Sequence, residues 1–223
     1  MKVEVIKSVF ECNDTYAKKN RQYFKEKNVF VVNIISSPGA GKTSILECLI
    51  PLLKEQIQVA VIEGDLYTTK DADRIEGLGV EVVQINTEGA CHLDARMITQ
   101  AVESIDLQET DLLIIENVGN LVCPAEFDLG ENMKIHIASV TEGNDKPLKY
   151  PLIYEKAQLV LLNKLDLIPY VAFDLTVYKE DLQNINPKLE WLGISARSGE
   201  GIKEVAQWLV EKVKKQNEDT RLL

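Results

Sequence analysis

Residues 36–43 read Ser-Ser-Pro-Gly-Ala-Gly-Lys-Thr, a spacing that could bind the phosphates of a nucleoside triphosphate. Lys42 would place a positive charge at the β- and γ-phosphates, and the Thr43 hydroxyl can ligate Mg²⁺. Backbone N–H groups of the turn would converge on the phosphates at the positive end of a helix. We therefore expect the phosphates to be bound by Pro38, Gly39, Ala40, Gly41, Lys42, Thr43 and Ser44.

The flanks of this loop support the prediction, although its first position departs from the usual pattern. An apolar, β-branched run at 29–35 precedes the loop and a helical pattern at 44–50 follows it, so a strand and a helix meet there. The usual pattern begins with Gly six residues before the lysine, where this chain has Ser36. Gly39 and Gly41 still supply a permissive backbone, so we interpret Ser36 as a variant. The alternative is a glycine turn followed by Lys-Thr by chance.

Residues 163–166, Asn-Lys-Leu-Asp, could select the base of the nucleotide. A carboxylate at Asp166 can accept both N–H donors on one edge of guanine, while Asn163 contacts the opposite edge and the Lys164 stem packs on the ring. Adenine lacks that donor pair and would leave the carboxylate unpaired, which costs several kcal/mol. A polar turn could contain the same residues. The order of motifs favours guanine, since Ser195 and Ala196 follow in a stretch similar to the GTPase loop whose N–H groups reach the guanine oxygen.

Cys91, His92 and Cys123 could hold a metal ion. The first two are adjacent in a loop that opens a predicted helix, and Cys123 lies 32 positions later. Two thiolates and an imidazole suit Zn²⁺ or Ni²⁺, and a helix N-terminus would favour the thiolate form of Cys91. Three ligands leave a position open for water or for the same trio from a second subunit. From spacing alone, a buried thiol and a surface imidazole are an equal alternative.

The remaining thiols and the second histidine have simpler interpretations. Cys12 and Cys48 lie in helical patterns, where a small buried hydrophobic side chain is the favoured reading. His136 lies inside a strand pattern, so we expect a structural role for it. Four cysteines in a chain of this kind do not indicate a disulfide framework.

Strand and helix patterns alternate along the chain, and the polar motifs stand where strands end. This alternation predicts an α/β fold with a single doubly wound, mostly parallel sheet and helices on both faces. Such sheets bind ligands at the carboxyl ends of their strands. The expected strands are 29–35, 58–62, 80–85, 111–115, 133–140, 157–162 and 189–194; the expected helices are 8–27, a helix from 44, 69–78, 93–104, 173–184 and 201–215; 121–131 is expected to be irregular, and 86–92 and 141–147 are expected to be loops.

We expect one P-loop GTPase domain at residues 29–216, an N-terminal helical extension at 1–28 and a polar tail at 217–223. The extension places Val9, Cys12, Tyr16 and Tyr23 near one stripe of a helix. It could cover an edge of the sheet or meet a partner chain. No internal repeat or linker divides the rest.

Composition narrows the class of partner. The chain has 223 residues and a formal net charge of −10, with 45% hydrophobic and 27% charged residues, as in an ordinary globular protein. An acidic surface repels phosphate backbones, so we expect neither nucleic acid nor an anionic membrane as the main partner. The first residues lack the long apolar core of a signal peptide, and we expect a cytoplasmic protein.

The ordered motifs resemble a GTPase of the SIMIBI class and, within it, the hydrogenase nickel-incorporation GTPases of the HypB family. The resemblance covers the chain from Val29 onward. Its most specific part is residues 115–124, Ile-Glu-Asn-Val-Gly-Asn-Leu-Val-Cys-Pro. The other stretches that carry it are 36–43, 63–65, 91–93, 141–143 and 163–166. The paired serines at the start of the phosphate loop also fit that family.

The resemblance implies a GTP- and Mg²⁺-dependent homodimer that binds GTP and GDP and delivers Ni²⁺ to [NiFe]-hydrogenase, through a nickel-accepting maturation partner or to the hydrogenase large subunit. It favours a metal, Ni²⁺ or Zn²⁺, at the two cysteines and the histidine. Some members carry a cysteine-rich N-terminal motif or a histidine-rich tract. This sequence starts without either and has two histidines, so we expect nickel transfer through the internal site.

For hydrolysis, Asp65 and Glu116 stand at strand ends suited to hold Mg²⁺ with Thr43, directly or through water, and to orient the attacking water. Asn120 takes the place after Gly119 where other GTPases carry Gln. No arginine finger is evident, so we expect slow intrinsic turnover. We expect the catalytic residues to be Lys42, Asp65 and Asn120, with Lys146 as a contact across the dimer.

Gly119 occupies the position where GTPases use a backbone N–H to sense the γ-phosphate, and Cys123 follows four residues later. Four residues span at most about 14 Å, so a movement of Gly119 must be felt near the metal ligand. We hypothesise that GTP hydrolysis reshapes the metal site and changes its affinity or the dimer contact.

Three alternatives stay open. A urease-accessory-type GTPase also serves nickel, but it usually places its metal residues in a Cys-Pro-His motif that this chain lacks. An ATP-dependent biosynthetic enzyme or partition ATPase on the same fold often has an extra lysine early in the phosphate loop, where this chain has Ser37. A metal-binding module with a vestigial nucleotide site is disfavoured by the intact Lys42, Thr43 and Asp65.

Overall fold

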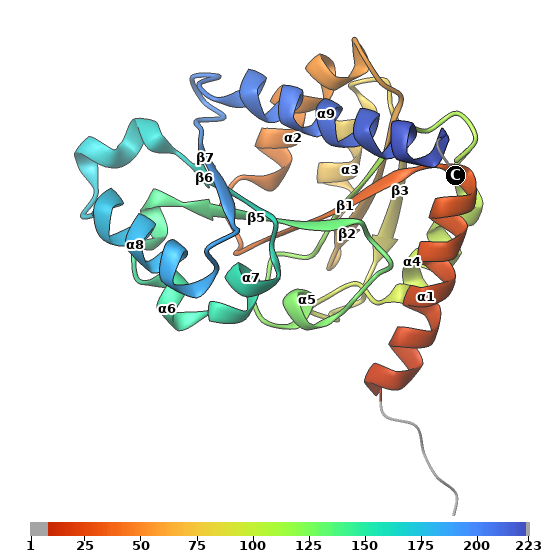
Figure 1. The fold of residues 1–223 in the computed structure, drawn as a ribbon, viewed down its shortest axis with the longest axis horizontal. Coiled ribbons are helices and arrows are strands. Elements are labelled where there is room, and N and C mark those ends of the chain that lie inside the picture. Colours follow the sequence, from red (N-terminus) through yellow and green to blue (C-terminus); the bar gives the residue numbers. More distant parts are fainter. Residues whose placement is uncertain (1–8, 222–223) are drawn as a thin grey trace, which may run out of the picture.

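The computed structural model of the chain describes residues 9–221. Its centre is a seven-stranded sheet in the order β3-β2-β4-β1-β5-β6-β7, in which each strand runs parallel to its neighbours (Figure 1). The expected doubly wound α/β fold is confirmed. The strands are β1 Phe30–Ser36, β2 Val59–Asp65, β3 Glu81–Asn86, β4 Leu112–Glu116, β5 Met133–Ser139, β6 Leu159–Asn163 and β7 Glu190–Gly193.

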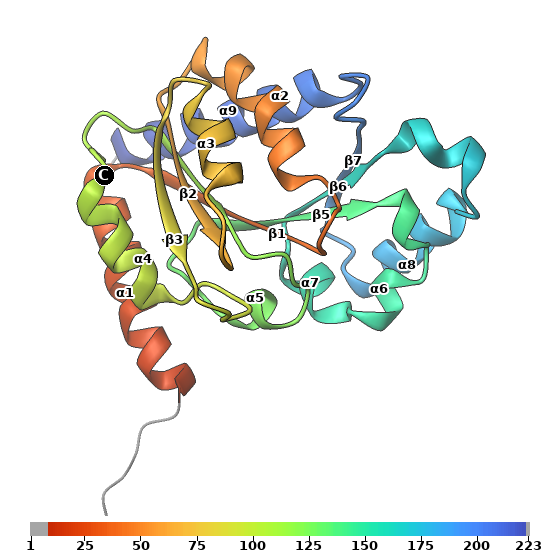
Figure 2. The same cartoon turned by 180° about the vertical axis from the view of Figure 1, so that it is seen from behind.

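Helices cover both faces of this sheet, which is why the central strands are buried along their whole length and are mostly apolar. Every residue of β1, β4 and β6 is buried. Helices α2 (Lys42–Lys54), α3 (Lys70–Glu76) and α9 (Ile202–Arg221) lie on one face (Figures 1 and 2). The other face carries α1 Val9–Lys27, α4 Ala95–Ala101, α5 Cys123–Glu126, α6 Lys146–Lys149, α7 Pro151–Lys156 and α8 Leu175–Ile185. Short 3-10 helices are η1 Val102–Ser104, η2 Val140–Glu142 and η3 Leu165–Tyr170.

Three short helices lie where the sequence predicted irregular structure or made no prediction. Helix α5 falls within the segment 121–131, α6 begins inside the predicted loop 141–147, and α7 follows that loop. Each has a proline in its first turn: Pro124, Pro147 and Pro151. Helices of four to six residues are too short to show a hydrophobic period. The proline at the start of each helix was the available signal.

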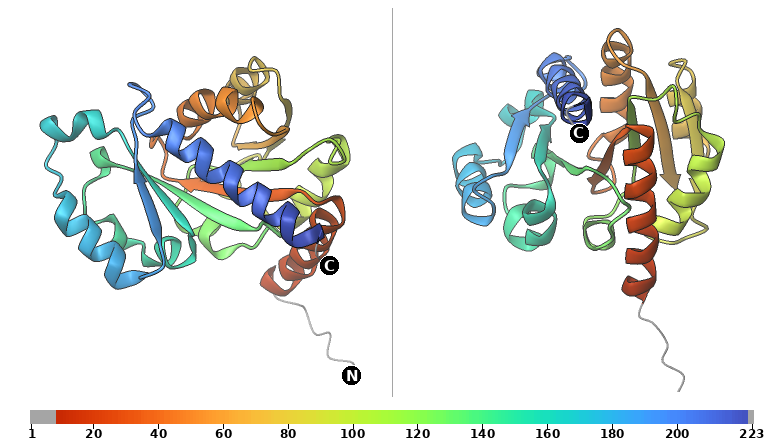
Figure 3. Two further views of the ribbon diagram at one scale, coloured as in Figure 1. Left: turned by 45° about the horizontal axis from the view of Figure 1, so that its top comes forward. Right: turned by 45° about the vertical axis from the view of Figure 1, so that its right-hand side comes forward.

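The last helix is longer than expected. Helix α9 continues to Arg221 instead of ending at 215, because residues 216–221 contain no Gly or Pro to stop it. The described part of the expected polar tail at 217–223 is therefore helical. Its end lies beside the end of α1 (Figure 3), where Asn28 Nδ2 donates to Asn217 Oδ1 at 2.7 Å. The boundaries 1–28, 29–216 and 217–223 stay predictions, and residues 1–8 and 222–223 lie outside the described residues.

Helix α1 packs on the sheet domain through a different stripe from the expected one. Val9 is 72% exposed, and Cys12 and Tyr23 are exposed as well, so the prediction of a buried Cys12 was wrong. The buried stripe is Asn13, Ala17, Asn20 and Phe24. Its two asparagines are buried because their amides are hydrogen-bonded, a compensation that hydrophobic period does not reveal. None of the helices in residues 9–221 combines the length and the hydropathy needed to cross a membrane.

Candidate functional site

The phosphate loop joins β1 to α2 at the carboxyl end of the sheet. Gly41 has φ of 102°, and a Cβ there would lie 2.6 Å from Asn163 Nδ2, so both its backbone conformation and its surroundings require glycine. The Lys42 ammonium lies 3.2 Å from Ser36 Oγ. The serine that replaces the usual glycine is buried and turns its hydroxyl toward the lysine. The variant loop therefore keeps the lysine beside the turn.

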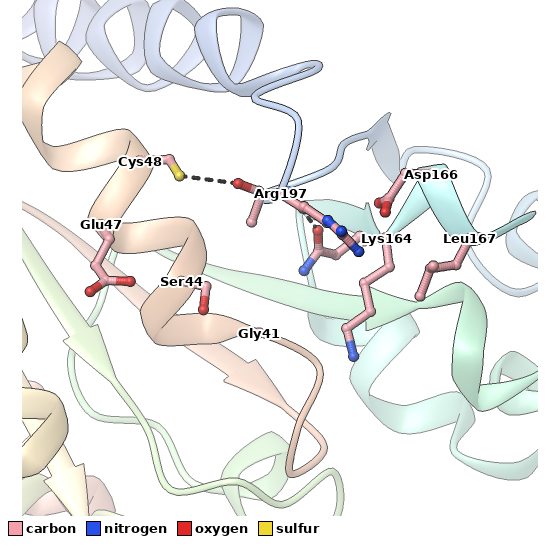
Figure 4. A pocket seen from close by; sticks show the side chains of 10 residues that line it. Gly41, Ser44, Glu47, Cys48, Lys164, Asp166, Leu167 and Arg197 are labelled. Atoms are coloured by element: carbon pink, nitrogen blue, oxygen red, sulfur yellow. Dashed lines mark hydrogen bonds between the residues drawn. The ribbon is translucent and has the colours of Figure 1, made fainter.

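The predicted base-selecting residues surround a cavity of about 480 Å³ next to this loop (Figure 4). Asn163 ties two loops together: its Nδ2 donates to Ala40 O at 2.8 Å, and its Oδ1 accepts from Ala196 N at 3.1 Å. The Lys164 Nζ donates to Gly39 O at 2.8 Å. The cavity is lined by Gly41, Ser44, Glu47, Cys48, Asn163, Lys164, Asp166, Leu167, Ala196 and Arg197.

Two further contacts hold the base loop. Ser195 is buried, and its Oγ donates to Asp166 Oδ1 at 2.6 Å, so its side chain orients the carboxylate. The thiol of Cys48 on α2 donates to Ala196 O at 3.4 Å, and Figure 4 shows this bond at the rim of the cavity. Burial raises the pKa of the Cys48 thiol. The sequence did not predict this contact, although Cys48 lies one helical turn after Ser44 on the same face of α2.

A second, smaller cavity of about 150 Å³ adjoins the lysine of the phosphate loop and collects the predicted magnesium ligands. Thr43 Oγ1 donates to Glu116 Oε1 at 2.9 Å. Burial raises the pKa of Glu116 to about 6, against the opposing effects of Lys42 and the Thr43 hydrogen bond. Asp65 lines the same cavity, and its Oδ1 accepts from Tyr67 N at 2.9 Å. Lys42, Asp65 and Glu116 are thus brought together as predicted.

Glu63 and Asp71 belong to this cavity and were missed. Glu63 is 2% exposed and lies directly opposite Glu116 in the sheet. Burial, together with the charges of Glu116, Asp65 and Asp71, raises the pKa of Glu63 to about 8. Ligand oxygens of Glu63, Asp65 and Asp71 lie within 4.8 Å of one another. Glu63 precedes Asp65 by two residues on one strand, and this period-two spacing was the signal.

The carboxylates of this cavity suit a divalent cation. Among the described residues, Glu63 Oε2 and Glu116 Oε2 are buried and have no hydrogen-bond partner. Buried carboxylate oxygens without partners are costly, and a hard cation such as Mg²⁺ would satisfy them. Thr43, Glu63, Asp65, Asp71 and Glu116 are the side chains that could share such an ion.

The predicted nickel or zinc ligands also come together. Cys91 Sγ lies 3.2 Å from Cys123 Sγ and 3.7 Å from His92 Nδ1. The three ligand atoms fall within 4.8 Å of one another, and this donor set fits a soft or borderline ion. Burial lowers the pKa of His92, which favours the neutral imidazole that binds metals. We call this group the Cys/His corner.

The prediction that a helix N-terminus favours the thiolate form of Cys91 was wrong. Cys91 lies three positions before Asp94, the residue that caps α4, so a helix N-terminus does not act on its thiol. Cys123 is the residue that begins a helix, α5. Its hydrogen bond with Cys91, followed by burial and the Cys91 charge, raises the pKa of Cys123. His136, by contrast, is fully buried with Nδ1 3.1 Å from Ile35 O, as its expected structural role requires.

The loop between β4 and α5 reaches both sites. A Cβ on Gly119 would lie 3.2 Å from the Pro38 Cα, so this backbone passes against the phosphate loop. Asn120 Nδ2 donates to Cys91 O at 3.2 Å, and its Oδ1 accepts from Val122 N at 3.1 Å. The side-chain amide of Asn120, which we expected to be catalytic, is therefore directed to the Cys/His corner. Its catalytic role stays a prediction.

The predicted contact across a dimer, Lys146, is the first residue of α6. Its Nζ lies 4.0 Å from Asp145 Oδ1. Nearby, the Ser37 hydroxyl donates to Glu142, whose pKa is raised by burial. These contacts describe the surroundings of Lys146 in one chain, and its role across a dimer stays a prediction.

Comparisons with known proteins give this geometry a family. Residues 30–193 match the family described as CobW/HypB/UreG, nucleotide-binding domain. Hydrogenase maturation factor HypB of Rhizobium leguminosarum bv. viciae is 48% identical over 207 residues, which cover 93% of this chain and 69% of that protein. The HypB of Azotobacter vinelandii is 53% identical over 197 residues, 88% of this chain and 65% of that protein. The chain thus spans about two thirds of the length of these two relatives. Hydrogenase/urease maturation factor HypB of Helicobacter hepaticus is 40% identical over 214 residues, 94% of this chain and 88% of that protein.

Two solved structures share the fold closely. HypB from Helicobacter pylori in complex with nickel superposes with a TM-score of 0.86 at 38% identity, covering 92% of this chain and 96% of that one. HypB from Archaeoglobus fulgidus gives a TM-score of 0.85 at 35% identity, with 91% and 99% covered. Since the family match spans most of the sheet domain and these relatives align over nearly the whole chain, the chain belongs to the HypB family within the CobW/HypB/UreG group.

Proposed function

We propose that this protein is a GTP-hydrolysing nickel metallochaperone for [NiFe]-hydrogenase maturation, in which the nucleotide state controls the Cys/His corner and a homodimer contact. The observation that carries the proposal is the loop after β4. Within five residues it meets the phosphate loop through Gly119, meets the Cys91 loop through Asn120, and supplies Cys123. A single short peptide therefore links the two sites.

At the nucleotide, the backbone of the phosphate loop and Lys42 bind the β- and γ-phosphates. Asp166, oriented by Ser195, accepts the N–H donors of guanine. Thr43, Asp65 and Glu116 would hold Mg²⁺, and the partnerless buried oxygens of Glu63 and Glu116 support a cation there. Bound Mg²⁺ would neutralise charge that develops on the transferred phosphoryl group.

Hydrolysis is slow in this proposal because few groups activate the water. Asp65 is our choice to polarise the water, and it lies in the same cavity as Lys42. Asn120 follows Gly119 where a glutamine would help, but its amide is hydrogen-bonded to Cys91 O. Lys146 would add its charge across the dimer.

At the Cys/His corner, nickel is the cargo. Cys91, His92 and Cys123 bind it from one side, and water or the same trio of a second subunit completes the coordination. Nickel-complexed HypB from Helicobacter pylori supports nickel as the ion. The acceptor would be a nickel-accepting maturation protein or the hydrogenase large subunit.

Urease maturation is a second candidate, since the Helicobacter hepaticus relative is described as a hydrogenase/urease maturation factor. Nickel-loaded protein would then activate an apo-urease as well as an apo-hydrogenase. Activation of the hydrogenase alone would remove this candidate.

The proposal is tested by titrating Ni²⁺ and Zn²⁺ into protein loaded with GDP or with a non-hydrolysable GTP analogue, followed by native mass spectrometry and thiolate absorption. We expect one ion per Cys/His corner, or one shared by two subunits, with an affinity that differs between nucleotide states. The Cys91→Ser and Cys123→Ser double variant should lose the thiolate band. Equal nickel affinity in both nucleotide states, together with unchanged dimerisation, would overturn the coupling.

A further inference from the structure

The metal ligands stand on two separate segments that share no strand pairing. Cys91 and His92 precede α4, and Cys123 begins α5, which leads into residues 127–130. We call residues 91–95 the histidine arm and residues 123–130 the cysteine arm. A metal that needs all three ligands needs these two arms at a fixed separation. Helix α1 contacts both arms.

Two buried asparagines of α1 bind backbone atoms of both arms. Asn13 Oδ1 accepts from Ala95 N at 2.9 Å, while its Nδ2 donates to Asp128 O at 2.8 Å. Asn20 Nδ2 donates to Ala95 O at 2.8 Å and to Leu129 O at 3.0 Å. Each amide therefore bridges the histidine arm to the cysteine arm across the helix.

The backbone of the cysteine arm fits closely against α1. A Cβ at Gly130, whose φ is 93°, would lie 2.7 Å from Ala17 O, so the loop approaches the helix as near as a glycine permits. Arg21 forms a salt bridge to Asp128 with both carboxylate oxygens, at 2.7 and 2.8 Å. These contacts fix residues 128–130 relative to the helix.

An aromatic stack continues from α1 to a metal ligand. The Phe10 ring centroid lies 5.2 Å from that of Phe127, and the Phe127 centroid lies 3.9 Å from that of His92. Both separations are within contact distance for paired rings, and Phe127 comes from the cysteine arm while His92 belongs to the other. The Phe127 ring therefore joins the imidazole of one arm to the other arm.

We propose that α1 is the positioning element of the Cys/His corner: through Asn13, Asn20 and the stack Phe10–Phe127–His92, it holds the two ligand-bearing arms in register for the metal. This inference rests on the proposed metal function. It gives the helix a role in metal affinity, with Phe127 as the positioning residue next to the imidazole. The nucleotide site, which α1 does not line, is unaffected.

The first test observes the imidazole directly. The chain has two histidines, so their ring C–H resonances are readily assigned, and His136 serves as an internal reference. In metal-free wild type we expect the His92 resonances to carry a ring-current shift from Phe127. Phe127→Leu should remove this shift and leave His136 unchanged, whereas Phe127→Tyr should retain it.

The second test measures Ni²⁺ affinity in competition with a chromophoric chelator. Phe127→Leu should weaken Ni²⁺ binding on the order of tenfold, as removal of an outer contact of a metal ligand typically does. Phe10 lies near the start of α1 and is 48% exposed, so Phe10→Leu should fold normally. This variant should weaken Ni²⁺ binding about threefold. Phe127→Tyr should restore the wild-type affinity. Phe173→Leu is the matched control, since its ring pairs with Tyr178 at the same 5.2 Å separation away from the metal.

The outcomes separate the two proposals. Suppose that the cysteine double variant loses Ni²⁺ binding, whereas Phe127→Leu and Phe10→Leu bind Ni²⁺ like wild type and their His92 resonances stay at the wild-type positions. The positioning role of α1 is then overturned and the metal function stands. If Ni²⁺ binding survives the loss of both cysteines, both proposals fail. Weaker binding in the two phenylalanine variants but not in Phe173→Leu supports the inference.

Discussion

The nucleotide end and the Cys/His corner of this protein are built in different ways. At the nucleotide end, the turns that follow buried parallel strands form the site. Lys42, Asp65, Glu116 and Asp166 each lie within a few residues of a strand end. The Cys/His corner has no strand of its own. Its ligands lie on a loop and on the first residue of α5, and side chains of α1 hold these two segments together over sequence separations of 75 to 115 residues. One site is built from local motifs and the other from long-range contacts.

This difference has a consequence for coupling. The two sites share one segment, the loop after β4, because Asn120 bonds to the Cys91 loop while Gly119 lies against the phosphate loop. A change at the phosphate loop can then reach the Cys/His corner through this segment.

The largest effect is expected from Lys42→Ala. Removal of the ammonium at the phosphates should reduce GTP hydrolysis on the order of a hundredfold or more, as loss of one preorganised charge does in other sites. Phosphate release from the variant and wild type measures this. Ni²⁺ binding to the nucleotide-free variant should remain unchanged. A parallel loss of Ni²⁺ binding would show that the two sites are not separable.

Asp166→Asn should weaken GTP binding by roughly a hundredfold, because the amide cannot accept two N–H donors from guanine. An amide can instead accept one N–H and donate to a carbonyl, which is what xanthine presents on that edge. Fluorescent-analogue competition with GTP and XTP measures both affinities. A variant that keeps its preference for guanine would exclude Asp166 as the selecting residue.

At the other site, His92→Ala should lower Ni²⁺ affinity by about tenfold or more while basal GTP hydrolysis without metal stays within about twofold. The matched control is Cys12→Ser, which alters an exposed thiol on α1 that takes no part in the corner. Chelator competition and phosphate release, run on the same preparations, provide the two readouts. A fall in Ni²⁺ affinity in Cys12→Ser would place a metal ligand outside the corner.

The smallest effect concerns pH. The pKa of Glu63 is raised to about 8, so in metal- and nucleotide-free protein its contribution to stability is present below about pH 4.5 and is lost as pH rises through about 8. Glu63→Gln should therefore gain thermal stability relative to wild type by a few degrees as pH rises from 5 to 9. Melting curves in chelator measure the difference. If the melting temperatures of the two proteins depend on pH in the same way, the pKa of Glu63 is not raised in the folded protein.

Much of the nucleotide end was predictable because its signals are local. The strand before the phosphate loop, Asp65 and Glu116 at strand ends, and the guanine motif after β6 all follow from period, spacing and order. Glu63 was missed although it precedes Asp65 by the period of a strand. The short helices α5, α6 and α7 were missed because four to six residues show no helical period.

The Cys/His corner was only partly predictable. The three ligand types indicated a soft metal, but the spacing left a buried thiol as an equal alternative until the structure brought the three ligand atoms within 4.8 Å. The stripe of α1 was predicted wrongly, because a buried asparagine is stable only when distant backbone groups satisfy its amide. Phe127 and the direction of the Asn120 amide depend on such contacts too, and no local pattern contains them.

The most direct test of the link between the two sites is the affinity of a non-hydrolysable GTP analogue, measured with and without saturating Ni²⁺ in wild type and Asn120→Ala. Because coupling between sites is reciprocal, we expect nickel to change the analogue affinity of wild type by about fivefold or more, and to change that of Asn120→Ala much less. An analogue affinity that Ni²⁺ leaves unaltered in wild type would contradict the account.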